Sequence, residues 1–148
     1  MRVIRATLSH LDQLAVLFDG YRIFYKQASD IDACRSFLKE RLENDESVIF
    51  SVENEQSDLL GFTQLYPLFS SVRVRRVWLL NDLFVAMNAR RLGVGEMLMN
   101  AARDFAKETG ARGVALETGV NNTSAQALYE KLGYERVEGA YWYFLGVD

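Results

Sequence analysis

Cysteine, histidine and proline are nearly missing from this chain of 148 residues, which has one of each. The single cysteine, Cys34, cannot form an internal disulfide. Together with the single histidine, His10, it is also a poor starting set for a four-ligand zinc site. A chain of this length can bury about two-thirds of its unfolded surface, so it needs neither kind of cross-link to fold. We therefore expect no metal.

Excess positive charge and long apolar runs are missing too. The net charge is −3, whereas nucleic-acid-binding domains normally carry a basic excess. No apolar run reaches the ~18 residues that cross a bilayer. The stretch Met1–Ala6 also lacks the hydrophobic segment of a signal peptide. These absences predict a cytoplasmic protein that binds neither nucleic acid nor membranes.

The spacing of apolar residues predicts alternating helices and strands in the order β-α-α-β-β-β-α-β-α-β-β. The expected strands are 2–6, Ser47–Glu53, Leu59–Tyr66, Arg75–Val85, Val114–Thr118, Tyr134–Val137 and Tyr141–Leu145. The expected helices begin near Ser9, Asp30, Val94 and Thr123. No linker or repeat divides residues 1–148, so we expect a single domain of the α/β (α+β) class. Its mostly antiparallel sheet would have about seven strands, helices on both faces and one parallel crossover.

A glycine loop, Arg90-Arg91-Leu92-Gly93-Val94-Gly95, lies between an expected strand and an expected helix. A helix N-terminus offers unpaired N–H groups and partial positive charge, and glycines let an anion approach the backbone. The loop is not a Walker sequence, and Leu98 stands where a dinucleotide fingerprint needs its last glycine. By itself the loop predicts an anion site or a tight turn with two solvated arginines.

Three segments that follow one another along the chain narrow the choice between an anion site and a tight turn. They are Asn81-Asp82-Leu83-Phe84-Val85, the Arg-x-x-Gly-x-Gly of Arg90–Gly95, and Asn122-x-x-Ala-x-x-Leu-Tyr-Glu-Lys-Leu-Gly-Tyr134. Together they resemble the GNAT superfamily of N-acetyltransferases. The stretches Gly61–Ser71 and Val77–Val85 look most like the diamine (spermidine/spermine) acetyltransferases and related small-amine enzymes.

The resemblance implies that acetyl-CoA is the cosubstrate and that its pantetheine arm lies between two splayed parallel strands. It also implies a role for each matching position. The cofactor-binding residues would be Leu83, Phe84, Val85, Arg90, Arg91, Leu92, Gly93, Val94, Gly95, Glu96, Asn122 and Tyr129. The backbone of the splayed strand would stabilise the oxyanion, and Tyr129 would protonate the leaving thiolate as general acid. Packing in the core is the other interpretation of Tyr129.

The attacking ammonium, with a pKa near 10.4, must first lose a proton. The diamine enzymes have a glutamate at the position of Asn81, and asparagine cannot take a proton in that way. Asp82 and Glu117 are the substitute candidates for a catalytic base, and each could instead be a salt-bridged or solvated residue. Strict alternation would put Asn81 and Asp82 on opposite strand faces unless a bulge intervenes.

Acceptor-binding candidates come from the first two helices and from Asn81. Tyr21, Tyr25 and Asp30 combine aromatic rings with a carboxylate, which suits a small cation. Packing for the tyrosines and helix capping for Asp30 are the alternatives.

The sequence therefore predicts direct transfer of an acetyl group, in a ternary complex, to the primary amine of a polyamine or an amino-acid-like molecule. Acetylation of protein N-termini or lysines, and non-catalytic sensing of CoA, are the alternatives. The aromatic segment Tyr141–Phe144 is too apolar for an exposed strand. We expect it to complete the core or to form a homodimer contact.

Overall fold

The computed structural model describes residues 1–148, which divide into two compact units, Met1–Glu117 and Thr118–Asp148. The first unit contains β1 (Arg2–Arg5), η1 (Leu8–His10), α1 (Leu11–Phe24), α2 (Ile31–Glu43), β2 (Val48–Glu53), β3 (Leu59–Ser70), β4 (Arg75–Val85), η2 (Met87–Ala89), α3 (Val94–Glu108) and β5 (Val114–Leu116). The second unit contains α4 (Thr123–Lys131).

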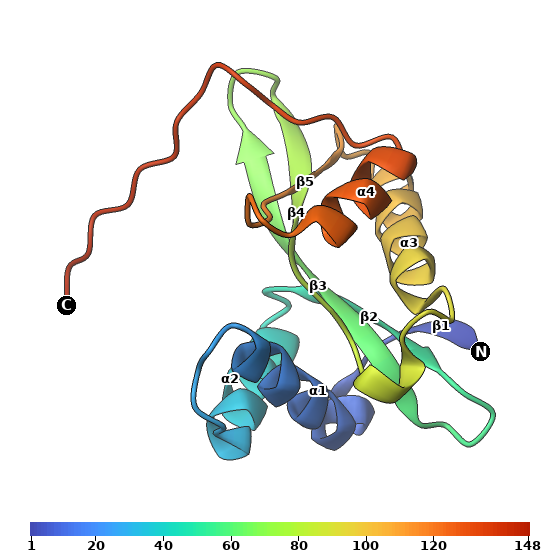
Figure 1. Ribbon diagram of the computed structural model, residues 1–148. Helices are drawn as coiled ribbons and strands as arrows, with labels where there is room; N and C mark the ends of the chain where they lie inside the picture. The colour runs from blue at the N-terminus through green and yellow to red at the C-terminus, as the bar shows by residue number, and fades with distance from the viewer. The chain divides into compact units, whose positions relative to one another are not determined.

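The sheet of the first unit is mixed, with strand order β1-β2-β3-β4-β5. The first three pairings are antiparallel, and β4 pairs with β5 in parallel. The parallel crossover from β4 to β5 runs through α3, as the sequence predicts. Helices cover both faces of this sheet, with α1 and α2 on one and α3 on the other (Figure 1).

Side chains of the strands alternate between these two faces, because successive Cβ atoms of a strand point to opposite sides. Ile49 and Phe62 pack with α1 and α2, and Phe84 lies against the same cluster. Val52 packs on the opposite face with Val94 and Leu98 of α3. Burial of both faces explains why these strands lack polar alternation.

Gly61 fixes how closely β3 approaches β4 and α3. A Cβ at this position would lie 2.7 Å from the carbonyl oxygen of Phe84 and 3.1 Å from Cγ1 of Val94. Only glycine fits there without a shift of backbone, and the close approach brings the end of β4 next to the start of α3.

The sheet has five strands rather than the seven expected from the sequence. Residues 134–137 and 141–145 belong to no strand, and the side chains of Tyr141 to Leu145 are exposed. Their aromatic composition favours a pleated, half-buried surface, but a strand also needs a neighbouring strand, which composition cannot supply. The predicted strand at Val114–Thr118 is shorter and ends at Leu116.

β3 continues through Pro67, where the sequence predicts its end. Pro67 pairs with Trp78 of β4, whereas the last pair between β2 and β3 is Val48 with Leu65. Beyond Leu65 one side of β3 is therefore open. A proline is tolerated there because no neighbouring strand needs its missing N–H.

Candidate active site at the bulge of β4

β4 carries one extra residue, Asn81, in the middle of its pairing with β3. Leu80 pairs with Leu65 and Asp82 with Gln64, so Asn81 has no partner across the ladder. This is a β-bulge, and it changes which residues face which helix layer.

The packing shows this change of face directly. The Trp78 ring lies 5.0 Å from the Phe105 ring of α3, and Leu83 also packs on the α3 face. An uninterrupted pleat would put two residues five positions apart on opposite faces. The bulge therefore turns Asp82 and Phe84 toward α1.

The parallel pairing of β4 with β5 ends just before the bulge, at Leu80 and Leu116. Beyond it, the backbone N–H of Ala86 donates to the carbonyl of Leu60. Since backbone groups alternate in direction along an antiparallel strand, the peptide groups of Leu83 and Val85 point away from β3. They line the edge of β4 along which β5 no longer pairs.

Asp82 is a buried carboxylate that accepts hydrogen bonds from two side chains and lies near a third. Oδ2 accepts a hydrogen bond from Nε2 of Gln64 at 2.7 Å, and Oδ1 accepts one from Nδ2 of Asn81 at 3.2 Å. The Tyr21 phenol lies within hydrogen-bonding reach of the same carboxylate. Burial raises the pKa of Asp82, while the bonds from Gln64, Tyr21 and Asn81 act in the opposite direction.

Tyr21 connects α1 to the bulge. Its hydroxyl donates to the backbone carbonyl of Asn81 at 3.3 Å. Burial, and then the charge of Asp82, raise the pKa of Tyr21. The phenol therefore stays protonated and acts as a hydrogen-bond donor beside the carboxylate.

The other two predicted acceptor-binding residues lie differently. The Tyr25 ring is exposed and meets the Tyr21 ring edge-on, with centroids 5.0 Å apart. Oδ1 of Asp30 accepts from the backbone N–H of Ala33 at 3.0 Å, which makes Asp30 the N-cap of α2. Tyr21 therefore contacts the bulge and Tyr25 contacts Tyr21, whereas Asp30 caps the start of α2.

Glu117, the other candidate base, is exposed one residue beyond the end of β5. The hydrogen-bond partners of Asp82 do not include it. Of the two candidate carboxylates, only Asp82 lies at the bulge.

The loop Arg90–Gly95 leads into α3 through two residues in the left-handed conformation, Arg91 (φ 63°) and Gly93 (φ 82°). Gly93 is the N-cap of α3 and has no side chain to bond the first helical N–H groups. Arg90 donates from Nε to the carbonyl of Val85 at 3.3 Å. Both arginines and Leu92 are exposed. This end of α3 has the donors and the positive charge that an anion requires.

In the second unit, Asn122 rather than Thr123 is the N-cap of α4. Oδ1 of Asn122 accepts from the backbone N–H of Ala125 at 3.4 Å. Nε2 of Gln126 donates to the carbonyls of Gly119 and Val120. Tyr129 is half-buried on α4, and its ring centroid lies 6.1 Å from that of Tyr134.

The sequence alone did not identify three of the residues near the bulge, which are Ser47, Gln64 and Tyr66. Gln64 is fully buried between Ser47 and Asp82. Tyr66 has its pKa raised by burial and then by the charge of Asp82. A glutamine inside an apolar strand was the available signal, but only the strand register shows what it binds.

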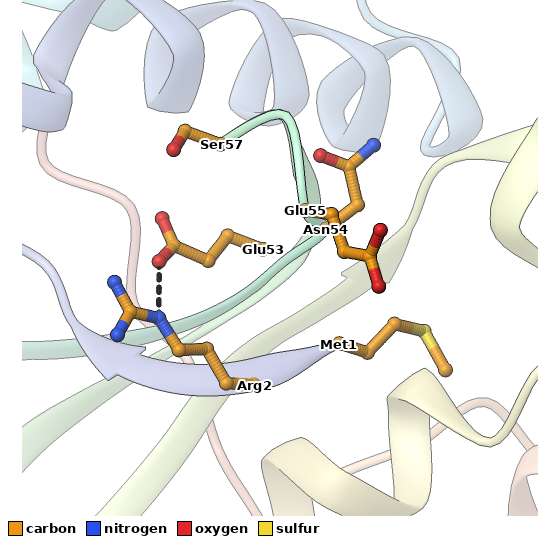
Figure 2. A pocket seen from close by; sticks show the side chains of 6 residues that line it. All are labelled: Met1, Arg2, Glu53, Asn54, Glu55 and Ser57. Atoms are coloured by element: carbon orange, nitrogen blue, oxygen red, sulfur yellow. Dashed lines mark hydrogen bonds and ion pairs between the residues drawn. The ribbon is translucent and has the colours of Figure 1, made fainter.

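A separate shallow hollow lies at the ends of β1 and β2 (Figure 2). Its lining residues are Met1, Arg2, Glu53, Asn54, Glu55 and Ser57. Figure 2 shows the Arg2 guanidinium bonded to the carboxylate of Glu53, so the two charges already neutralise each other. We therefore take the bulge, not this hollow, as the candidate site.

No cluster of three or more His, Cys, Asp or Glu side chains could hold a metal ion. None of the helices is both long enough and apolar enough to cross a membrane.

Comparison with known proteins gives the family. The model of the acetyltransferase (GNAT) family matches residues 12–134. The uncharacterized N-acetyltransferase YhfO of Bacillus subtilis is 48% identical over 147 residues, which cover 99% of this chain and 98% of the relative. A probable acetyltransferase of Haemophilus influenzae is 31% identical over 124 residues, covering 84% and 85% of the two chains. The crystal structure of a probable acetyltransferase has a TM-score of 0.94 at 44% identity, and covers 100% of this chain and 99% of that chain.

These matches define the class of protein: the chain belongs to the acetyltransferase (GNAT) family. Within that class it is an N-acetyltransferase. Members of the family generally use acetyl-CoA. The likeness to diamine acetyltransferases stays a prediction.

Proposed function

We propose that this enzyme transfers the acetyl group of acetyl-CoA to the primary amine of a small molecule. One observation carries the proposal. A buried carboxylate, Asp82, and a phenol, Tyr21, meet at the bulge where β4 parts from β5. Next to this point the peptide groups of Leu83 and Val85 have no strand partner on the β5 side, and α3 begins at Gly93 without a side-chain cap.

The residues around this opening fit acetyl-CoA. The peptide groups of Leu83 and Val85 have no strand partner on the β5 side, so they suit an extended amide-bearing arm. The uncapped N–H groups at the start of α3 suit a pyrophosphate, with Arg90 and Arg91 adding charge. We propose that Asn122 and Tyr129, which match positions of the GNAT motifs in the sequence, also bind the cosubstrate.

When bound, acetyl-CoA supplies a thioester carbonyl that an amine nitrogen can attack. Asp82 takes the proton that the ammonium must lose, through water at the exposed Asn81. Burial supports this role because it raises the pKa of Asp82 toward the range in which a carboxylate accepts protons effectively. Tyr129 provides the proton for the departing thiolate.

Asparagine at position 81 is consistent with a base at position 82. A glutamate there would put a second negative charge beside the buried Asp82, and like charges disfavour ionisation of both groups. Asn81 instead donates a hydrogen bond to Oδ1 of Asp82. The proton acceptor is thereby displaced by one residue relative to the diamine enzymes.

A small cationic acceptor is supported by the groups near Asp82. Tyr21, Tyr25 and Tyr66 provide aromatic and phenolic surface, and the carboxylate provides the opposite charge.

We further propose that both units form one catalytic domain, since the family match spans them. The exposed segment Tyr141–Phe144 is our candidate for a homodimer contact, and sedimentation tests it.

The test measures free thiol released from acetyl-CoA with polyamines, amino acids, aminoglycosides and peptides as acceptors. We expect release with small primary amines, and at least about a hundredfold lower kcat/KM for Asp82→Asn. Glu117→Gln is the matched control and should stay near wild type. Release only with peptides or intact proteins would favour a protein acetyltransferase. Tight acetyl-CoA binding without any release would favour a CoA sensor.

A further inference from the structure

A line of buried polar side chains crosses three strands and ends at Asp82. Oγ of Ser47, which precedes β2, donates to Oε1 of Gln64 in β3 at 2.8 Å. Nε2 of Gln64 then donates to Oδ2 of Asp82 in β4 at 2.7 Å. All three residues are buried, and Gln64 has no exposed surface.

The direction of each bond follows from the chemistry of the groups. An ionised carboxylate can only accept, so Asp82 selects the nitrogen end of the Gln64 amide, and the hydroxyl of Ser47 stabilises this orientation by donating to the amide oxygen. The amide nitrogen must then face Asp82, and it can only donate. A hydrogen bond from this donor to Oδ2 stabilises the ionised carboxylate more than the neutral acid.

The same arrangement separates the two oxygens of Asp82. Oδ2 is directed to the fully buried Gln64. Oδ1 is directed to Asn81, whose side chain is exposed at the bulge. Only Oδ1 therefore faces the side from which a proton can arrive.

We propose that Gln64, oriented by Ser47, is a positioning residue that holds Asp82 ionised and directs Oδ1 toward Asn81 as the proton-accepting atom. This inference rests on the proposed role of Asp82 as base. Gln64 is fully buried, so it touches neither substrate nor cosubstrate and acts only through the carboxylate.

The electrostatics agree with the geometry. Burial alone pushes the pKa of Asp82 upward, and the bond from Gln64 is the largest influence in the other direction. The remaining groups around Asp82 are Tyr21 from α1 and Tyr66 from β3, and Arg41 of α2 acts on Tyr66. None of these is a cation in contact with Asp82, so the amide of Gln64 is the principal group that keeps the buried charge.

The experiment records kcat/KM against pH for an accepted amine. The acid limb of this profile is the pH range in which kcat/KM falls because Asp82 becomes protonated. In Gln64→Leu this limb should move to higher pH by about one unit, so kcat/KM on the acid side should be about tenfold lower than in wild type. Ser47→Ala removes only the orienting hydroxyl, so a smaller shift in the same direction is expected, with less risk to folding.

Thr63→Val is the matched control. Thr63 is also fully buried in β3, but its hydroxyl donates to the backbone carbonyl of Asp82 at 2.8 Å and not to the carboxylate. This variant should lose stability and leave the acid limb in place. An equal limb shift in Thr63→Val would show a general packing effect and overturn the inference.

Asp82→Asn separates this inference from the proposed function. If Asp82→Asn removes the acid limb but Gln64→Leu and Ser47→Ala leave it unmoved, Asp82 is the base and the inference about Gln64 is wrong. If Asp82→Asn keeps wild-type kcat/KM and its pH profile, the proposed base itself is wrong, and the role of Gln64 is rejected with it.

Discussion

The hydroxyl of Tyr21, on α1, donates to the backbone carbonyl of Asn81 across 3.3 Å. This bond joins a helix to the single residue of β4 that has no partner in β3. A bulge frees a backbone carbonyl from the ladder, and the helix next to it supplies the donor. The same phenol lies near Asp82 and lowers the pKa of that carboxyl.

Tyr21→Phe should lower kcat/KM by about three- to tenfold and move its acid limb to higher pH. The change keeps the ring packing but removes a hydroxyl that lowers the pKa of Asp82. A pH–rate profile measures both effects. Tyr25→Phe is the control, and it should leave the limb in place. A profile of Tyr21→Phe that overlays wild type would contradict the role of the phenol.

Asp82→Asn should raise the free energy of unfolding at pH 7 while it abolishes activity. Burial raises the pKa of Asp82 above 3.8 in the folded protein, so the folded state binds its proton more tightly than the unfolded state. The favourable contribution of that proton is complete below pH about 4 and is lost as pH rises through the folded pKa. The stability gain should therefore disappear in acid. Urea unfolding at pH 7 and pH 4 measures it, and a gain of equal size at both would count against a raised pKa.

Gly61→Ala should destabilise the protein by about 1–3 kcal/mol, because the added Cβ would overlap the carbonyl of Phe84. It should also weaken acetyl-CoA binding, since β4 and the start of α3 must both shift. Gly113→Ala is the control: no atom lies within 4 Å of its added Cβ, so a change of less than about 0.5 kcal/mol is expected. Urea unfolding and calorimetry with CoA are the measurements.

Arg91→Gln should weaken binding of acetyl-CoA by about three- to tenfold, and the loss should shrink at high salt. S-acetylpantetheine has no pyrophosphate, so its kcat/KM should be the same for Arg91→Gln and wild type. Arg112→Gln, an exposed arginine outside the loop, is the control. Equal losses with both thioesters would place the effect elsewhere than at the pyrophosphate.

Tyr129→Phe should slow kcat by at least about tenfold and leave the Kd of acetyl-CoA nearly unchanged, because it removes only the proton donor. Single-turnover rates and calorimetry separate the two quantities. Tyr134→Phe alters the neighbouring ring instead and should affect kcat less. If Tyr129→Phe weakened binding as much as it slowed turnover, the residue would contact the cosubstrate without acting as acid.

Local sequence determined much of this fold. Apolar spacing identified α1 to α4 and β4 with its correct bounds, since one buried face imposes a period that a single segment reveals. The order of Asn81–Val85, the glycine loop and Asn122–Tyr134 was enough to indicate the family, because these motifs depend on backbone geometry within short stretches.

Only the tertiary structure decided where each carboxylate lies. The sequence left Asp82 and Glu117 as equal candidates, and the bulge at Asn81 turned Asp82 into the sheet beside Tyr21 while Glu117 stayed exposed. The tertiary structure alone also decided the hydrogen-bond partners of Gln64 and the absence of strands at residues 134–137 and 141–145. Each depends on the register between strands, which is set by packing of residues far apart in the chain and leaves no local pattern.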